Sequence, residues 1–213
     1  MTTRHRWSHL WSQLGSAPPH GLFDELVARY SEKHRHYHTL QHLDECLRSL
    51  DDVAPLAVHA PEIGLALWFH DAVYDSHTQN NEELSAKWAR SIAVAAALPS
   101  ESCARIYNLI QVTASHSLPT THDEALLIDI DLSILGASPE RFEEYEQGIR
   151  SEYSWVPKPI FTAKRRSILE QFLQRETIFH TQYFIERYER QARVNLRQRQ
   201  SRQLSPLGLP TAP

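Results

Sequence analysis

Glycine and cysteine are scarce in this chain of 213 residues, and long apolar runs are missing. With six glycines and no long alternation of apolar and polar residues, the sequence gives little support for a β-sheet. No stretch of about 18 apolar residues occurs, so no segment is expected to span a membrane. The N-terminus lacks an apolar signal core, which favours a cytoplasmic protein.

The two cysteines, Cys46 and Cys103, are far apart and show no metal-ligand spacing. In a cytoplasmic protein we expect reduced thiols that pack in the core, with a disulfide as the less favoured alternative. The formal net charge is −4, although residues 186–202 carry six Arg against two Glu. Such an arginine-rich helix is more often a solvated face than a nucleic-acid site, so nucleic acid is not the expected partner.

Apolar residues recur at intervals of three and four, which predicts an all-α fold. We expect a single compact domain of about eight helices over residues 1–197, followed by a proline-rich, disordered tail at 198–213. Besides a helix that leads into His70, the pattern places helices at residues 7–14, 23–30, 37–50, 82–98, 102–115, 139–153, 163–175 and 178–197. Trp7 and Trp11 fit either the core or a homodimer interface.

A histidine–aspartate pair at the end of an apolar run is the most informative feature. Residues 63–69 are almost wholly apolar, which predicts a buried helix, and His70 and Asp71 follow directly. Burial of both groups is costly unless a partner stabilises them. A divalent metal ion would do so, since imidazole nitrogen and carboxylate oxygen are good ligands for such ions.

Other segments supply further candidate ligands. His38 and His42 are four residues apart and would share one face of the expected third helix. Asp129 and Asp131 stand in an apolar run and would point about 200° apart on a helix, so we expect one to bind metal and the other to cap or hydrogen-bond. A lone histidine is more often an ordinary core or surface residue, but this combination favours a metal site.

Three motifs, taken in their order along the chain, resemble the HD superfamily of metal-dependent phosphohydrolases: Tyr37-His38-Thr39-Leu40-Gln41-His42, His70-Asp71 and Asp131-Leu132-Ser133. Over residues 30–196 the chain also resembles one subfamily of small, largely uncharacterised HD proteins. The segments that carry this resemblance are Arg35-His36-Tyr37-His38, 68–75, Asn81-Glu82-Glu83, Ser85-Ala86, 130–136, Arg150-Ser151-Glu152-Tyr153 and 192–196. The resemblance implies an HD-type helical domain and, as substrate, a small phosphorylated molecule such as a nucleotide or related metabolite.

When the ligand positions of this superfamily are matched to the sequence, the resemblance implies that His42, His70, Asp71 and Asp131 are the four metal ligands. The spacing Tyr-His-x-x-x-His is also similar to that of cyclic-nucleotide phosphodiesterases, which makes His38 the candidate general acid. A set of His and Asp ligands does not distinguish Mn, Mg, Fe, Co, Ni and Zn. The implied reaction is cleavage of a phosphate ester or anhydride by a metal-activated water.

Several charged residues are candidates for the remaining roles. Glu82 or Asp75 could position the water. The alternative interpretation of Glu82 is a carboxylate that stabilises a helix N-terminus, and that of Asp75 is an ordinary turn residue. Arg35 and Arg150 are the preferred residues for substrate phosphate, although such arginines often form only surface pairs. His116 could be a ligand of a second metal ion. The favoured interpretation is that it lies at a helix C-terminus and interacts with the helix dipole.

The sequence leaves two other functions open. Some HD-fold proteins hold two irons and activate oxygen, which would need a fuller second ligand set than His116 provides. A metal-stabilised domain that binds a nucleotide without catalysis is the other alternative. Turnover of a phosphate ester would separate both from the hydrolase.

Overall fold

The computed structural model describes residues 3–114 and 118–204, and within these ranges all regular structure is helical. This confirms the predicted all-α class. The expected count of about eight helices is not confirmed, because the described residues form segments α1 to α11, some of them short. None of the described helices is long and apolar enough to cross a bilayer. The candidate second-metal residue His116 lies outside the described residues.

The chain divides into two compact units, Met1–Asp131 and Leu132–Pro213. This boundary falls inside the range 1–197 that the sequence analysis assigns to one domain. The first unit contains α1 (Thr3–Gln13), α2 (Leu22–Tyr30), α3 (Leu40–Val53), α4 (Ala60–Phe69), α5 (Asn81–Ala95), α6 (Ser100–Gln111) and nearly all of α7 (His122–Leu132). Short 3-10 turns follow α3 (Ala54–Leu56) and α6 (Val112–Ala114).

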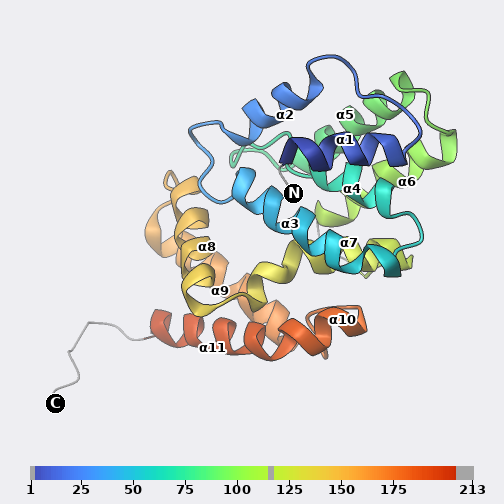
Figure 1. The fold of residues 1–213 in the computed structure, drawn as a ribbon. Coiled ribbons are helices and arrows are strands. Elements are labelled where there is room, and N and C mark those ends of the chain that lie inside the picture. The colour runs from blue at the N-terminus through green and yellow to red at the C-terminus, as the bar shows by residue number, and fades with distance from the viewer. Residues whose placement is uncertain (1–2, 115–117, 205–213) are drawn as a thin grey trace. The chain divides into compact units, whose positions relative to one another are not determined.

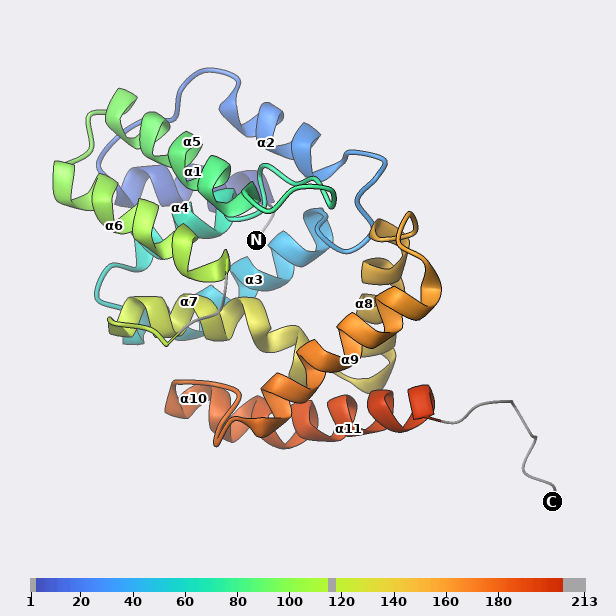
Figure 2. The same ribbon diagram turned by 180° about the vertical axis from the view of Figure 1, so that it is seen from behind.

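Helix α4 forms the centre of the first unit, and α1, α3, α5 and α6 pack around it (Figures 1 and 2). Residues 63–69 are all buried, which confirms the predicted buried helix. Trp7 and Trp11 belong to this core, and the Trp7 ring lies 4.8 Å from that of Trp68. An almost wholly apolar helix can be covered on every side, so its C-terminal end lies deep in the unit.

Helix α3 begins later than predicted, and this corrects the placement of His38. Thr39 is the N-cap: it has extended backbone angles, and its side chain accepts a hydrogen bond from the Gln41 amide. His38 therefore lies in the turn before the helix, whereas His42 lies in its first turns. The two histidines do not share a helix face, although the sequence spacing predicts it.

The second unit contains α8 (Pro139–Glu152), α9 (Lys158–Gln174), α10 (Gln182–Phe184) and α11 (Arg190–Leu204). A π-helical turn (Ile185–Glu189) joins α10 to α11, and a 3-10 turn (Ser133–Gly136) precedes α8. Ser138 accepts a hydrogen bond from the Arg141 amide, which confirms the predicted helix cap. Helix α11 continues past the expected end at residue 197, and residues 205–213 lie outside the described part.

Buried polar contacts hold the second unit together. Glu146 is fully buried and accepts hydrogen bonds from Arg165, while Arg199 Nε lies 2.9 Å from its other oxygen. The Asn195 amide donates to the carbonyls of Leu135 and Ala137, at 2.9 Å each. Because a buried polar group without a partner is costly, these contacts tie α11 to α8, α9 and the 3-10 turn.

Candidate metal centre

Four side chains, from α3, from α7 and from the C-cap of α4, converge near the C-terminal end of α4. His42, Cys46, His70 and Asp131 each offer a ligand atom, and these atoms lie within 4.8 Å of one another. This group could hold a metal ion. All its members belong to the first unit, so the candidate centre is contained within residues 1–131.

The separations of the donor atoms suit one cation. His42 Nε2 lies 3.2 Å from His70 Nε2 and 3.1 Å from Asp131 Oδ1, and His70 Nε2 lies 3.6 Å from that same oxygen. Ligand atoms about 2.0–2.2 Å from a tetrahedral cation are separated by about 3.3–3.6 Å. Only small shifts would therefore be needed for these side chains to bind a common ion.

Asp71 adds an oxygen to the same place. Its Oδ2 lies 2.9 Å from His70 Nε2 and 3.6 Å from His42 Nε2, so the structure brings together all four predicted ligands. This oxygen is buried, and no hydrogen bond of normal geometry reaches it. A buried carboxylate oxygen in that condition is costly unless a cation or proton neutralises it. The Asp71 oxygen therefore fits a metal ligand.

The outer nitrogens of both imidazoles have partners. His70 Nδ1 lies 2.8 Å from the carbonyl oxygen of Leu67, which can only accept, so this nitrogen carries a proton. His42 Nδ1 lies 3.0 Å from the hydroxyl of Tyr37. In metal sites the ligating histidine commonly donates its other N–H in this way, which orients the ring. Both Nε2 atoms consequently point into the cluster.

The charges of the metal-free cluster compensate one another. Burial on its own lowers the pKa of His70, but Asp71 and Asp131 raise it well above its usual value. Burial would raise the pKa of Asp71, yet His70 and His38 hold it well below its usual range. A protonated His70 therefore faces ionised Asp71 when no metal is bound. A metal ion would displace this proton, so metal and proton compete for the centre.

Cys46 belongs to the cluster, although the sequence analysis treats it only as a core residue. It is buried, and the structure shows neither cysteine in a disulfide. Its sulfur is equidistant from both ring nitrogens of His42, at 3.7 Å. Burial and the nearby Asp131 raise the pKa of the thiol well above its usual value. Cys46 therefore packs against a ligand ring.

Asp71 and Asp131 form the accessible side of the centre. Each carboxylate side chain is 14% exposed, whereas His42 and His70 are almost fully buried. The neighbouring Asp129, on the same helix, is fully buried. The two aspartates of α7 thus differ in burial, and their division into a metal ligand and a capping or hydrogen-bonding residue stays a prediction.

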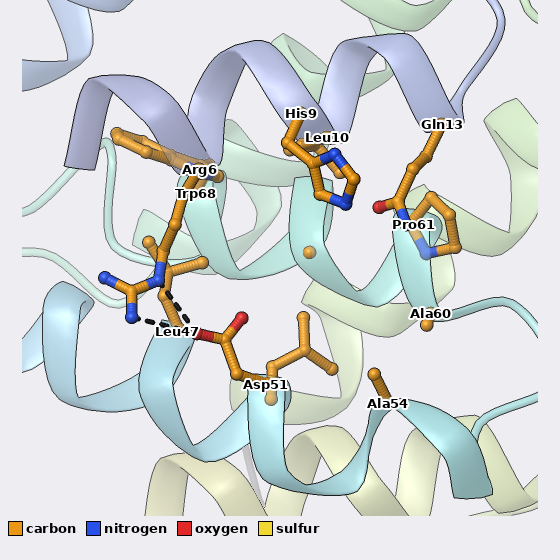
Figure 3. A pocket seen from close by; sticks show the side chains of 12 residues that line it. Arg6, His9, Leu10, Gln13, Leu47, Asp51, Ala54, Ala60, Pro61 and Trp68 are labelled. Atoms are coloured by element: carbon orange, nitrogen blue, oxygen red, sulfur yellow. Dashed lines mark hydrogen bonds and ion pairs between the residues drawn. The ribbon is translucent and has the colours of Figure 1, made fainter. Parts of the chain in front are cut away.

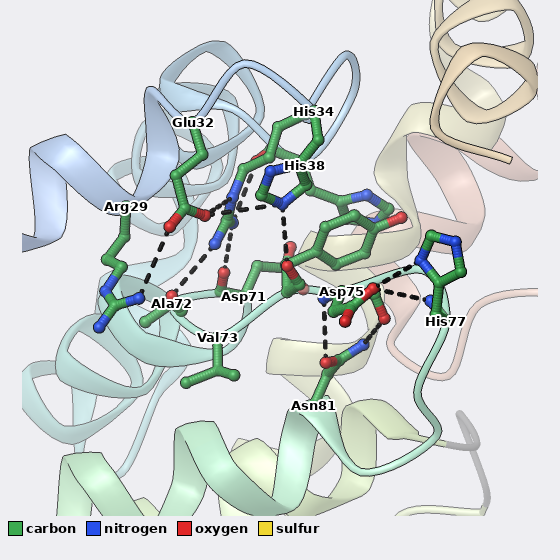
Figure 4. Close-up of polar contacts among 12 residues, drawn as sticks. Arg29, Glu32, His34, His38, Asp71, Ala72, Val73, Asp75, His77 and Asn81 are labelled. Atoms are coloured by element: carbon green, nitrogen blue, oxygen red, sulfur yellow. Dashed lines mark hydrogen bonds and ion pairs between the residues drawn. The ribbon is translucent and has the colours of Figure 1, made fainter. Parts of the chain in front are cut away.

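Arg35 has a different position from the one predicted for a phosphate-binding residue. Its side chain is fully buried and donates hydrogen bonds to Glu32 Oε2 and to the carbonyls of His38, Asp71 and Ala72, at 2.6–3.3 Å (Figure 4). These contacts join the turn before α3 to the segment after α4. The guanidinium is therefore occupied by the protein itself.

Two residues of α5 hold the segment that leaves the centre. Ser85 Oγ accepts a hydrogen bond from the Val73 amide. The Asn81 side chain accepts a hydrogen bond from the Asp75 amide and donates one to the Asp75 carbonyl (Figure 4). The sequence alone did not predict these roles for Asn81 and Ser85, although both lie in segments that carry the resemblance. Their short polar side chains just after the His-Asp segment were the available signal.

The candidate catalytic residues differ in burial and in the groups that they contact. His38 is partly buried, and its ring centre lies 6.1 Å from that of His42 and 4.2 Å from that of Tyr74, on which it stacks. Asp75 is exposed, and its Oδ1 is 2.9 Å from both the amide and the ring nitrogen of His77. This contact, mainly the amide hydrogen bond, lowers the pKa of Asp75.

Glu82 and Arg150 complete the set of predicted residues. Glu82 is partly buried in the first turn of α5, next to Asn81. Arg150 lies in the second unit, where its guanidinium donates to the carbonyls of Tyr153, Ser154 and Val156 at 3.0–3.4 Å. It stabilises the C-terminal end of α8 and the turn beyond it, so its contacts in this unit are structural.

A separate pocket lies between α1, α3 and α4 and has a volume of about 180 Å³ (Figure 3). An apolar floor that includes Leu10, Leu47 and Gly64 is bordered by Arg6 and Asp51, which form an ion pair at 2.8 Å. None of the predicted site residues lines it. The pocket therefore has no part in the candidate metal centre.

Comparison of this chain with protein-family models, with curated proteins and with solved structures found no match.

Proposed function

We propose that this chain is a metal-dependent phosphohydrolase of the HD superfamily, with His42, His70, Asp71 and Asp131 as ligands of a divalent cation. The buried Oδ2 of Asp71, which no hydrogen bond of normal geometry reaches, is the observation that carries this proposal. It lies 2.9 Å from His70 Nε2, in a cluster that also holds His42 and Asp131. A proton on His70 only partly compensates such a group, whereas a divalent ion would neutralise both carboxylates.

A divalent cation in such a centre lowers the pKa of a bound water and polarises a phosphoryl oxygen. The chain's own contribution is to orient the donors: the carbonyl of Leu67 fixes the His70 ring, and the end of α4 directs Asp71 to the same point. The exposed edges of Asp71 and Asp131 leave one side for the substrate. The substrate we propose is a phosphate ester or anhydride of a nucleotide or related small metabolite.

His38 is the proposed general acid. It is partly buried beside the centre, and its charge contributes to the lowered pKa of Asp71, so the two groups interact. A protonated imidazole in this position can donate to the leaving oxygen of a phosphate ester. Glu82 and Asp75 remain the candidates to orient the attacking water, and the polar contacts of Asp75 with His77 and Asn81 keep it near the exit from α4.

The first test compares the metal content of the wild type with that of the double variant His70→Ala/Asp71→Ala. Phosphate release is measured on a panel of nucleotides and simple phosphate esters. The matched control is His59→Ala, which removes the imidazole of another His–Asp pair in the same unit, 3.0 Å from Asp123. We expect stoichiometric metal and turnover in the wild type and in His59→Ala, and loss of both in the double variant.

Other outcomes would contradict parts of the proposal. Metal that persists in the double variant would show that the ligand set is wrong. Metal without turnover of any phosphate ester would favour the non-catalytic nucleotide-binding domain. Two irons per chain with an oxygen-dependent optical signal would favour the oxygen-activating alternative.

A further inference from the structure

Outside the donor cluster, the described residues provide one hydrogen-bonding partner for His42, the hydroxyl of Tyr37. Tyr37 is 6% exposed, and its Oη lies 3.0 Å from His42 Nδ1. The two ring centres are 4.7 Å apart at an interplanar angle of 37°, so the rings also pack together. Tyr37 therefore fixes both the position and the rotation of the His42 ring.

The two imidazoles of the centre are supported in different ways. His70 Nδ1 faces a backbone carbonyl, which only accepts a hydrogen bond. His42 Nδ1 faces a hydroxyl, which can either donate or accept. The carbonyl fixes the His70 tautomer in every state, and no side-chain substitution removes it. The support of His42 depends on one side-chain oxygen.

We propose that Tyr37 is a positioning residue for the metal centre: its hydroxyl accepts the Nδ1–H of His42 and so keeps the Nε2 lone pair directed at the cation. This inference rests on the proposed metal site but not on the reaction assigned to it. The packing of the Tyr37 ring does not require the hydroxyl, since phenylalanine would keep the contacts with His38 and His42. Loss of the oxygen alone thus separates positioning from packing.

The first experiment measures the Co²⁺ affinity of metal-free wild type, Tyr37→Phe and Tyr107→Phe by competition with a chromophoric chelator. Tyr107→Phe is the control, because Tyr107 is a partly buried tyrosine of the same unit that lies on α6 and contacts Arg90 rather than a proposed ligand. Removal of a partner that orients a metal-bound histidine typically weakens metal binding about 10- to 100-fold. We expect this loss in Tyr37→Phe and an affinity near that of the wild type in Tyr107→Phe.

The second experiment records the proton NMR spectrum of the Co²⁺-loaded protein in H₂O and D₂O. The wild type should show strongly shifted, exchangeable N–H signals from the ligand imidazoles. In Tyr37→Phe the His42 signal should be lost to fast exchange with solvent, whereas the His70 signal persists because its carbonyl partner is unchanged. This spectrum reports on the hydrogen bond without any assumption about catalysis.

Co²⁺ affinity and both N–H signals unchanged in Tyr37→Phe would overturn the inference. If Tyr37→Phe does not fold, the wild-type spectrum still decides, because a missing His42 N–H signal contradicts the proposed hydrogen bond. Failure of the wild type to bind Co²⁺ overturns the metal centre together with this inference. Normal Co²⁺ binding without phosphatase activity overturns only the proposed reaction.

Discussion

Asp71 Oδ2 lies 2.9 Å from Nε2 of His70, the residue directly before it in the chain. Consecutive residues within a helix point about 100° apart and cannot meet in this way. Here α4 ends at Phe69 and His70 is its C-cap, so Asp71 follows after the last helical residue. Because α4 ends here, the side chains of His70 and Asp71, which are neighbours in sequence, can both direct a metal-ligand atom to the same point.

The pH dependence of the metal-free protein should report on this pair. The raised pKa of His70 contributes stability that is fully present below about pH 6.5 and is lost as the pH rises through the folded-state value. The lowered pKa of Asp71 contributes stability that is present above about pH 4 and is lost as the pH falls. Thermal unfolding of metal-free wild type should thus show a melting temperature that declines above neutral pH. In His70→Asn this alkaline decline should be much smaller; an equal decline in both proteins would contradict the assignment.

Substitution of Arg35 by methionine should destabilise the fold rather than only weaken substrate binding. The change leaves the carbonyls of Asp71 and Ala72 without their donor, and hydrogen bonds to charged groups contribute about 1.5–3 kcal/mol each. We expect the free energy of unfolding to fall by about 2–4 kcal/mol in urea denaturation. The control is Arg29→Met, because Arg29 is half exposed and pairs with Glu32 at 3.5 Å; its effect should stay within about 0.5 kcal/mol. A normal stability with a raised KM would instead favour the phosphate-binding role.

Gly136→Ala should be strongly destabilising. A Cβ atom at this position would lie 2.6 Å from Tyr188 Cβ and 2.7 Å from the Tyr188 carbonyl oxygen, and the backbone there cannot easily move. Overpacking of this kind costs about 1–3 kcal/mol or more. At Gly64 the nearest atom is a terminal methyl of Leu10, 3.1 Å away, so Gly64→Ala should cost less. Urea denaturation of both variants measures the difference, and equal losses would count against the close approach.

Cys46→Ala should retain the metal. The sulfur lies 3.7 Å from both nitrogens of the His42 ring, so we expect it to pack against this ring and the Co²⁺ spectrum of the wild type to lack an intense sulfur-to-cobalt charge-transfer band. Cys103→Ala, which removes the chain's other buried thiol, is the control. A charge-transfer band that disappears in Cys46→Ala and not in Cys103→Ala would make Cys46 a ligand.

The all-α class was predictable because apolar periodicity indicates helix faces. Histidine and aspartate in apolar segments indicated that some of them need a buried partner, but only the resemblance to the HD superfamily selected His42, His70, Asp71 and Asp131 as the set. The burial of residues 63–69 was predictable because they are almost wholly apolar.

Other features depend on contacts between distant segments. His38 lies outside α3 because Thr39 caps that helix, which the four-residue spacing of two histidines does not reveal. The occupied guanidinium of Arg35 depends on the path of the chain after α4, and the π-helical turn before α11 has no signal in residue type. Side-chain direction in turns is set by the fold, so these roles required the structure.

The order of the ligands along the chain has a consequence for assembly. Asp131 is the last residue of the first unit, and it lies 89 positions after His42 (131 − 42). A cation bound to both would act as a cross-link across that loop. By analogy with a disulfide of similar span, closing it removes chain entropy equivalent to on the order of 4–5 kcal/mol from the unfolded state. During synthesis, the first unit could gain this cross-link only after residue 131 has left the ribosome.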